Sequence, residues 1–438
     1  MVKPYLVKNG TLITMDPQKR ILSQGAVLVE GNTIAKILHK EEAELAAKGF
    51  DGDIIDAGGK LVLPGLVNAH GHAAMTLFRS YADDLPLMEW LEKKIWPLEK
   101  KLEPADVYWG TLLSILEMLK SGTTTFADMY FFMDEVARAV EESGLRGVLC
   151  RGLVGVGDSA LKGLKESKEF HRNWHQKAGG RITTTLGPHA PYTCPPEYLE
   201  QVLQLQKGLG VPLQIHLAET EGEMEYCREK YNMSPVELMN SIDLFSAPTL
   251  AAHCVHLSPE DIEILAEKKV RVAHNPGSNL KLASGISPLP RILEAGVVVG
   301  LGTDSAASNN NLDLLEEMRL AALIHKGVNK NSHAIPACKA LELATSSGAA
   351  AVFLENTGSL EAGKLADLVI INYDGVPHLT PGHNPVSDIV YSAGPRDVHL
   401  VMVDGVVLLE KGSCRLLDEE RIIFETKGRI AALLDRAR

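Results

Sequence analysis

The decisive stretch of the sequence is Pro64-Gly65-Leu66-Val67-Asn68-Ala69-His70-Gly71-His72, a short apolar run that ends in two histidines. Side chains two positions apart in an extended segment point to the same side, so both imidazoles can face one common space. Two nitrogen atoms can then converge on one ion. A His-x-His pair taken alone also fits two buried histidines with a structural role, so the choice depends on the rest of the chain.

Seven further apolar runs follow, and helical patterns separate most of them, which indicates repeated βα units around a parallel sheet of the α/β class. Most of these runs end in His, Asp or Arg, and barrel active sites lie at that end of the strands. Eight units in about 300 residues fit a closed (β/α)8 TIM barrel, although an open doubly wound sheet gives a similar pattern. The predicted strands are Leu66–His70, Thr123–Asp128, Gly147–Arg151, Ile182–Pro188, Pro212–His216, Thr249–His253, Arg271–His274 and Val297–Asp304.

Both ends of the chain have a different pattern. Short β-rich runs separated by turn residues such as Asn9-Gly10 fill the first part, and similar runs return near the C-terminus around Asp404-Gly405. We therefore expect residues 1–58 and 359–438 to form one discontinuous small β-sandwich domain. Residues 59–358 then form the barrel.

Composition and charge favour small-molecule chemistry. The 438 residues are 45% hydrophobic and 23% charged, which is ordinary for a globular protein. The net charge of −12 repels nucleic-acid backbones and anionic membranes on average. No apolar run approaches the roughly 20 residues that cross a bilayer, and the six cysteines form no Cys-x-x-Cys pair. We predict a cytoplasmic protein with a small-molecule partner, and neither a nucleic-acid nor a membrane partner.

Further polar residues end other predicted strands. His216 closes the fifth strand and is followed three residues later by Glu219, His253 closes the sixth, and Asp304 closes the eighth. Each of them alone fits a hydrogen-bonded core residue, because a buried polar group needs a partner wherever it lies. Their joint occurrence at one end of the predicted barrel favours a catalytic site instead.

Several motifs follow one order along nearly the whole chain: His70-x-His72, His216-x-x-Glu219, His253, His274-Asn275-Pro276-Gly277-Ser278-Asn279 and Thr303-Asp304. Longer strings accompany them, namely Trp96-Pro97-Leu98-Glu99, Leu186-Gly187-Pro188-His189-Ala190-Pro191-Tyr192 and Asp304-Ser305-Ala306-Ala307-Ser308-Asn309-Asn310-Asn311. With these motifs the chain resembles the amidohydrolase superfamily. Within it, the chain resembles the 5-methylthioadenosine/S-adenosylhomocysteine deaminases of the ATZ/TRZ-like metal-dependent hydrolases.

The resemblance implies one metal ion rather than two. In two-metal members a carboxylated lysine on the fourth strand bridges the ions, and the corresponding run Thr183-Thr184-Thr185-Leu186-Gly187-Pro188-His189 contains no lysine. The implied ligands are His70, His72, His216 and Asp304. Mixed nitrogen and oxygen ligands suit one Zn²⁺ per subunit, and Fe²⁺ stays an alternative.

The resemblance also implies a reaction, the hydrolytic deamination of 5-methylthioadenosine, S-adenosylhomocysteine or a related 5′-modified adenosine to the inosine derivative and ammonia. Such an enzyme is a hydrolase of carbon–nitrogen bonds in cyclic amidines. Asp304 is the expected general base, and His253 is expected to hold the attacking water. Glu219 is the expected acid for the purine ring nitrogen, which requires a pKa raised by burial or by negative charge nearby.

The expected substrate contacts extend beyond these catalytic groups. The resemblance makes Glu99 a carboxylate for the ribose hydroxyls, with a helical surface glutamate as the alternative. Arg151 is either a structural ion-pair partner or a substrate contact, and its place at the barrel mouth favours the second. His189 is expected to contact the nucleoside, and Glu219 and Asp304 complete the predicted substrate-binding set.

Other functions stay open at this stage. Another hydrolase on the same metal, such as a chlorotriazine hydrolase or a guanine deaminase, is the nearest alternative, although Glu99, Arg151 and His189 together favour a nucleoside over a bare ring. A catalytically dead scaffold like the dihydropyrimidinase-related proteins is the non-enzyme alternative. Family habit implies a homo-oligomer. We expect His256 to be structural and Cys254 to pack in the core.

Overall fold

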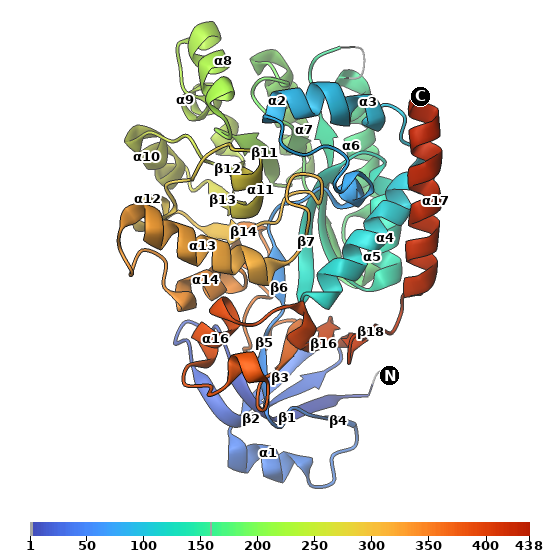
Figure 1. Cartoon of the computed structure of the whole chain (residues 1–438), viewed down its shortest axis with the longest axis vertical. Helices are drawn as coiled ribbons and strands as arrows, with labels where there is room; N and C mark the ends of the chain where they lie inside the picture. Colours follow the sequence, from blue (N-terminus) through green and yellow to red (C-terminus); the bar gives the residue numbers. More distant parts are fainter. Residues whose placement is uncertain (1–2, 158–159) are drawn as a thin grey trace.

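Two parts make up the computed structural model, which describes residues 3–157 and 160–438. A barrel with its surrounding helices forms one part, and a β domain built from both ends of the chain forms the other (Figure 1). The predicted α/β barrel with an attached β domain is therefore confirmed. None of the helices in the described residues combines the length and the apolarity needed to cross a membrane.

Parallel strands in two groups form the barrel wall. The first group comprises β6 (Leu66–Asn68), β7 (Thr123–Tyr130), β8 (Arg146–Leu153), β9 (Ile182–Thr184) and β10 (Gly187–Pro188). The second group comprises β11 (Leu213–Leu217), β12 (Thr249–His253), β13 (Arg271–His274) and β14 (Val299–Leu301). β9 and β10 share the fourth of the eight positions, so each predicted strand has a counterpart.

Backbone contacts join the two groups at both seams. Leu186 forms a parallel bridge with Leu213 at one seam, and Gly71 forms one with Asp304 at the other. At the second seam the N–H of Asp304 also donates to the carbonyl of His70 at 3.0 Å. Because both seams are closed, the sheet is a barrel, and the open doubly wound alternative is excluded.

Three predicted strands differ in extent from those of the structure. The fourth is interrupted between β9 and β10 and ends at Pro188, which has no N–H to continue a ladder. The eighth ends at Leu301 and not at Asp304, whose φ of 58° lies in the left-handed region and cannot continue a strand. His70 likewise follows β6 rather than ending it. His70 and Asp304 thus lie just beyond their strands, whereas His216 lies in β11 and His253 is the last residue of β12.

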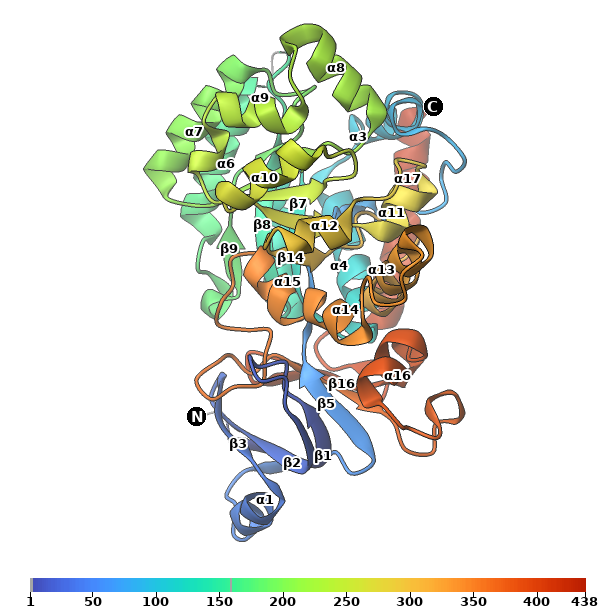
Figure 2. The ribbon, with the colours of Figure 1, turned by 90° about the vertical axis from the view of Figure 1, so that its left-hand side faces the viewer.

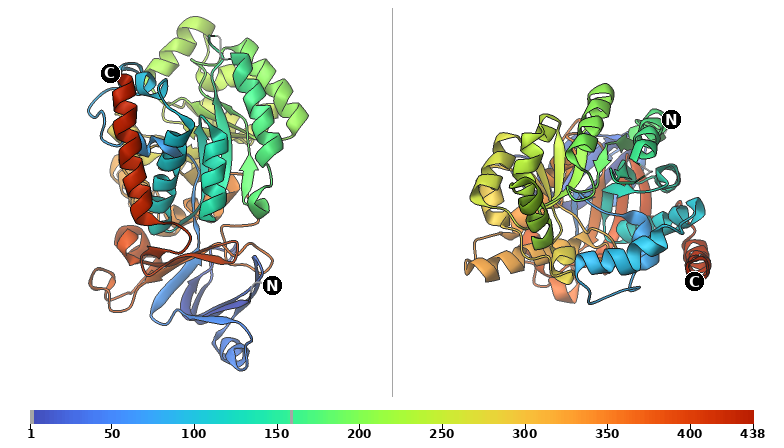
Figure 3. Two further views of the ribbon diagram at one scale, coloured as in Figure 1. Left: turned by 90° about the vertical axis from the view of Figure 1, so that its right-hand side faces the viewer. Right: turned by 90° about the horizontal axis from the view of Figure 1, so that it is seen from above.

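Helices cover the outside of the barrel, as the view from above shows (Figure 3). They are amphipathic, as in α5, where Val136, Ala137 and Val140 form a buried face. The covering helices are α4 (Pro104–Lys120), α5 (Met133–Ser143), α6 (Ala160–Trp174), α7 (Pro196–Leu209), α8 (Glu221–Tyr231), α9 (Pro235–Ser241), α10 (Pro259–Glu267), α12 (Leu289–Glu294), α13 (Leu314–Asn329), α14 (Ala337–Leu343) and α15 (Ser346–Ala351). Two short helices, α2 (Leu87–Trp90) and α3 (Trp96–Glu99), lie beside the mouth, and α11 (Pro276–Lys281) directly follows β13.

The β domain is a nine-stranded, mostly antiparallel sheet to which both ends of the chain contribute. Its apolar core contains side chains from both ends, for example Val27 and Met402. Its strands are β1 (Tyr5–Ile13), β2 (Ile21–Glu30), β3 (Thr33–Leu38), β4 (Asp53–Asp56), β5 (Lys60–Pro64), β15 (Leu368–Asn372), β16 (Val398–Val403), β17 (Val406–Glu410) and β18 (Ser413–Cys414). β5 pairs with both β1 and β15, which unites the two ends.

The division at residues 58 and 358 stays a prediction. β5, which this division gives to the barrel, pairs within the nine-stranded sheet, and its arrow points from that sheet toward the barrel (Figure 2). The C-terminal helix α17 (Glu419–Ala437) lies along the outside of the barrel (Figure 1). There Thr426 donates to the carbonyl of Trp109 in α4 at 3.2 Å.

A buried ion-pair network connects the barrel to the β domain. Arg146, at the start of β8, donates through Nε and Nη2 to the two carboxylate oxygens of Asp367, at 2.8 and 3.0 Å. Nη2 also donates to Asp404 at 3.2 Å. The Arg146 and Asp367 side chains are almost fully buried, so each charge depends on the other for compensation.

Replacing Arg146 with Ala leaves the Asp367 carboxylate buried and unpaired. We expect this change to lower the free energy of unfolding by about 3–5 kcal/mol in urea titrations. Arg138→Ala is the matched control, because Arg138 forms an exposed ion pair with Glu135 that is worth at most about 1 kcal/mol. Equal losses in the two variants would contradict a stabilising role for the junction.

Candidate active site

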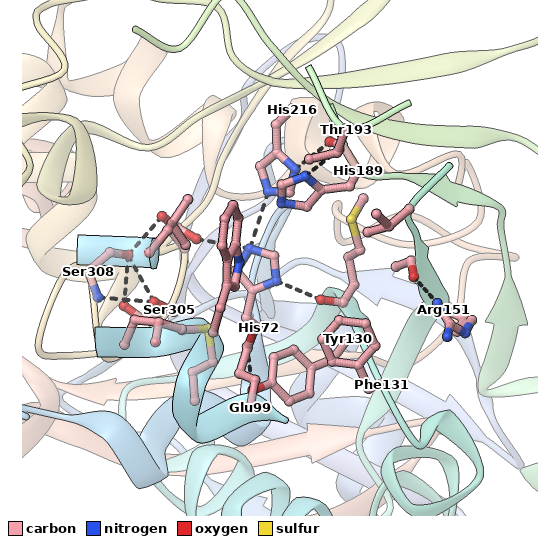
Figure 4. A pocket seen from close by; sticks show the side chains of 18 of the residues that line it. His72, Glu99, Tyr130, Phe131, Arg151, His189, Thr193, His216, Ser305 and Ser308 are labelled. Carbon is pink, nitrogen blue, oxygen red and sulfur yellow. Dashed lines mark hydrogen bonds and ion pairs between the residues drawn. The ribbon is translucent and has the colours of Figure 1, made fainter. Parts of the chain in front are cut away.

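Five side chains meet at the C-terminal end of the barrel strands. The Nε2 atoms of His70 and His72 lie 3.6 and 3.3 Å from Oδ1 of Asp304. His216 Nε2 is 3.3 Å from His72 Nε2, and these two rings face each other in Figure 4. Ligand atoms of His70, His216 and His253 all lie within 4.8 Å of one another, as do those of His70, His72 and Asp304. The structure therefore brings the four predicted metal ligands and His253 together.

Backbone carbonyls fix the protonation of two of these rings. His72 Nδ1 is 2.6 Å from the carbonyl oxygen of Met129, and His216 Nδ1 is 2.7 Å from that of His189. A carbonyl only accepts, so each Nδ1 carries the hydrogen, and in the neutral ring that binds a metal each Nε2 then presents a lone pair. Two lone pairs at 3.3 Å repel each other, and His70 Nε2 is buried with no hydrogen-bond partner. A divalent cation satisfies all three nitrogen atoms, so the residues fit a metal ion.

Asp304 is oriented by two serine hydroxyls. Its Oδ2 accepts from Ser278 at 2.5 Å and from Ser308 at 2.8 Å, which leaves Oδ1 directed at the histidines. Burial raises the pKa of Asp304, but the surrounding imidazoles and the Ser278 hydroxyl outweigh burial and lower the pKa to about 2. Asp304 is therefore an ionised oxygen ligand at neutral pH.

The turns that carry these groups contain left-handed backbone at residues other than glycine. Ala218, His253, Cys254 and Asp304 have φ values of 51°, 74°, 48° and 58°. Such conformations are costly for residues with a Cβ and cluster at functional sites. Hydrogen bonds hold the turns in place, since Val255 and His256 both donate to the carbonyl of Ala218 at 2.9 Å.

Glu219 and His253 lie side by side. Glu219 Oε1 is 3.8 Å from His253 Nδ1, and Nδ1 donates to Oδ1 of Asn279 at 2.8 Å. Nε2 of His253 is therefore left for the central space. Burial raises the pKa of Glu219, the His253 charge opposes this, and Asp304 adds to the increase. The sequence analysis requires a raised pKa for an acid at this position, and the environment of Glu219 provides one.

A cavity of about 890 Å³ opens onto the histidines and extends over the mouth of the barrel. This volume lies in the range of small-molecule sites. Much of its wall is apolar and comes from the α2–α3 segment, including Trp90, Ile95 and Trp96. The predicted substrate contacts also line it: Glu99, Arg151, His189, Glu219 and Asp304.

Glu99 is held by a neighbouring phenol. The Tyr130 hydroxyl donates to Glu99 Oε1 at 2.8 Å, inside the cavity rather than on an exposed helix face. Burial raises the pKa of Glu99 to about 7, although the hydrogen bond from Tyr130 opposes the increase. Figure 4 places Glu99 and Tyr130 on the same side of His72.

Arg151 forms an ion pair and also lines the cavity, and its contact with a substrate stays a prediction. Its Nε donates to Glu166 of α6 at 2.6 Å, and its guanidinium lies 5.5 Å from the centre of the Phe131 ring. The same side chain lines the cavity. His189 also lines it, with Nδ1 2.9 Å from the Thr193 hydroxyl.

His189 is neutral, because burial and the neighbouring histidines lower its pKa to about 4.

The two residues that were expected to have a structural role, His256 and Cys254, have surroundings that fit such a role. His256 Nε2 is 2.7 Å from the carbonyl oxygen of Ser284, which satisfies that nitrogen. Cys254 is buried, and burial raises the pKa of its thiol. The thiol therefore stays protonated and is a poor nucleophile.

The residues that position the functional side chains were not predicted from the sequence. Glu223 in α8 accepts from the N–H groups of Ala218 and Glu219 at 2.9 and 3.0 Å, and burial raises its pKa to about 7. Ser278 and Asn279 belong to the motif that begins at His274, but the sequence alone predicts no role for either of them. Their signal was the direct succession of two polar residues after the seventh strand.

The comparisons with known proteins agree over nearly the full length. The model of the amidohydrolase family matches residues 61–408. A curated protein of Pelotomaculum thermopropionicum, 5-methylthioadenosine/S-adenosylhomocysteine deaminase, is 50% identical over 432 residues, which are 98% of this chain and 99% of that protein.

Two solved structures have the same fold. An adenosine deaminase from Xanthomonas campestris with bound zinc has a TM-score of 0.94 and 32% identity, and the match covers 98% of each chain. The atrazine chlorohydrolase from Arthrobacter aurescens complexed with zinc has a TM-score of 0.90 and 27% identity, over 97% of this chain and 100% of that chain.

We predict that the purified chain binds about one divalent metal ion and that His72→Ala loses most of this metal, because the ion loses one ligand of a convergent set. Metal content per chain after gel filtration measures the effect. His256→Ala is the control and should keep the metal, since His256 faces the Ser284 carbonyl. Equal metal content in His72→Ala and the unmodified chain would contradict the site.

Proposed function

This chain belongs to the amidohydrolase family, among the 5-methylthioadenosine/S-adenosylhomocysteine deaminases, and we propose that it deaminates 5′-modified adenosines with the help of zinc. The substrate class comprises 5-methylthioadenosine, S-adenosylhomocysteine and related nucleosides, and the products are the inosine derivative and ammonia. The observation that carries the proposal is the meeting of unprotonated imidazole nitrogens and an ionised aspartate beside a buried glutamate.

His70, His72, His216 and Asp304 would hold the ion, with His253 beside them. The zinc reported in the Xanthomonas and Arthrobacter enzymes supports this choice of metal, while the ligand types alone also suit Fe²⁺. When bound, zinc supplies a hydroxide nucleophile at neutral pH, because it lowers the pKa of water toward about 7.

The protein groups then carry the protons. Asp304, fixed through Oδ2 by two serines, accepts the proton of the attacking water through Oδ1. His253, whose Nδ1 is anchored to Asn279, holds the same water through Nε2. Glu219 keeps its proton because of its raised pKa and donates it to the ring nitrogen beside the reacting carbon. A second proton transfer releases ammonia.

The cavity has groups that can bind the ribose and the 5′ substituent of a nucleoside. Glu99 accepts hydrogen bonds from the ribose hydroxyls, and Tyr130 holds its carboxyl group for this purpose. His189 and Arg151, which line the same cavity, contact other parts of the substrate. Met75, Met129 and Met133 line the same cavity, and polarizable thioether side chains suit a thioether substituent.

Two alternatives have less support. A chlorotriazine hydrolase is less favoured, because the chain is less similar to the Arthrobacter enzyme than to the Pelotomaculum deaminase, and a bare ring has no use for Glu99. A dead scaffold has no need for convergent lone pairs and a buried acid. The cytoplasmic location and the homo-oligomer stay predictions from the sequence.

We expect the purified chain to deaminate 5-methylthioadenosine and S-adenosylhomocysteine, with the loss of adenosine absorbance followed near neutral pH. Guanine and atrazine serve as controls because they lack the ribose that Glu99 binds, and we expect much slower turnover of both. Faster turnover of guanine or atrazine than of either nucleoside would contradict the proposal.

Replacing Glu219 with Gln removes the acid while keeping its shape. We expect kcat to fall by about 10²–10⁴-fold with the metal retained, as for the loss of general acid catalysis. Glu221→Gln, two residues away on an exposed position of α8, is the matched control and should leave kcat unchanged. Unchanged turnover in the Glu219 variant would show that the acid lies elsewhere.

A further inference from the structure

One buried carboxyl group has no part in the chemistry described so far. Glu317 in α13 has no exposed surface. Burial raises its pKa to about 8, only hydrogen bonds from Gly277 and Asn309 oppose the increase, and no cation of the described residues stabilises its charge. An apolar side chain would avoid the cost of burying this group. Glu317 therefore contributes to the structure through its hydrogen bonds and not through apolar packing.

Glu317 joins two loops of the active site. Its Oε2 accepts from the N–H of Gly277 at 2.9 Å, and its Oε1 accepts from Nδ2 of Asn309 at 2.8 Å. Gly277 lies in α11 after β13, and Asn309 lies on the loop after β14. We call the contact of Glu317 with Gly277 and Asn309 the joint. Nδ2 of Asn309 also donates to the carbonyl of Thr303 at 2.9 Å, so the joint is connected to the residue before Asp304.

Gly277, Glu317 and Asn309 are packed so closely that no side chain fits at position 277. A Cβ added to Gly277 would lie 2.4 Å from Oε1 of Glu317 and 2.5 Å from Oδ1 of Asn309. Real Cβ contacts are not that short, so either the two side chains or the α11 backbone would have to move. Only glycine allows the two loops and Glu317 to meet in this way.

These loops carry the contacts that orient two functional groups. Ser278, next to Gly277, donates to Oδ2 of Asp304 at 2.5 Å, and Asn279 accepts from Nδ1 of His253 at 2.8 Å. Ser308, next to Asn309, donates to the same Oδ2 at 2.8 Å. Figure 4 shows Ser308 on the side of the pocket opposite Arg151. Each half of the joint is thus one residue away from a hydrogen bond to Asp304.

We propose that Glu317 is a positioning residue that locks the α11 loop to the loop after β14 and thereby orients Asp304 and His253 toward the metal. Its effect on turnover rests on the proposed function. Its effect on metal affinity does not, because the affinity is measured without substrate.

Glu317→Gln opens the joint without changing its size. Both partners of Glu317 donate, so both of its oxygens accept, whereas a glutamine has one acceptor and one donor; with the Gly277 bond kept, its Nε2 would face Nδ2 of Asn309. Turning the Asn309 amide would repair this contact but place Oδ1 against the carbonyl of Thr303. Glu316→Gln is the matched control, since it makes the same substitution at the neighbouring, exposed position of α13.

The test is the zinc dissociation constant of each variant, measured by competition with a chromophoric chelator, followed by kcat and KM for 5-methylthioadenosine. We expect Glu317→Gln to weaken zinc binding about 10–100-fold, as is usual for groups that orient ligands. We also expect kcat to fall with KM little changed, while Glu316→Gln behaves as the unmodified chain. Gly277→Ala keeps the carboxyl group and should have the effects of Glu317→Gln.

A double variant tests the route of the effect. If Glu317 acts through Ser278, Glu317→Gln weakens zinc binding less in a Ser278→Ala background than alone. Circular dichroism shows whether each variant is folded, and Gly277→Ala decides the question if Glu317→Gln is not. Unchanged zinc affinity in the folded variants, or an equal loss in Glu316→Gln, would overturn the proposal. A chain that binds zinc but deaminates no nucleoside would overturn the proposed function alone, and the zinc affinities would still decide the role of Glu317.

Discussion

The mutual repulsion of unprotonated nitrogen atoms at the barrel mouth is the constraint on which the site depends. Carbonyl oxygens hold the hydrogens of His72 and His216 on Nδ1, so two Nε2 lone pairs are forced to within 3.3 Å of each other. His70 Nε2 is buried beside them without a partner. A polypeptide gains nothing from this arrangement by itself, and a cation turns each repulsive contact into a bond.

The rest of the fold holds this arrangement in place. The functional residues lie at or just beyond the ends of the strands, and left-handed backbone at His253 and Asp304 directs their side chains inward. Helices on the outside then support the turns with buried carboxyl groups: Glu223 accepts from the backbone at Glu219, and Glu317 accepts from both the α11 loop and Asn309. The scaffold therefore contributes rigidity at the positions where the chemistry needs fixed distances.

Much of this follows from the sequence, because strand periodicity and the polar ends of apolar runs are local signals. His70, His72, His216, His253 and Asp304 were found in this way. The supporting groups were not, since Glu223 and Glu317 look like ordinary helical glutamates until the fold buries them. The ion pair of Arg151 with Glu166 likewise depends on where α6 packs. The break between β9 and β10 and the end of β14 depend on backbone conformations that no local pattern specifies.

Anomalous diffraction at the zinc edge from crystals of the zinc-loaded chain tests the central claim most directly. The account predicts one peak per chain, with His70, His72, His216 and Asp304 at about 2.0–2.2 Å from it, the distances usual for zinc with nitrogen and oxygen ligands. A peak elsewhere, a second peak of equal height beside the first, or no peak at these side chains would contradict it.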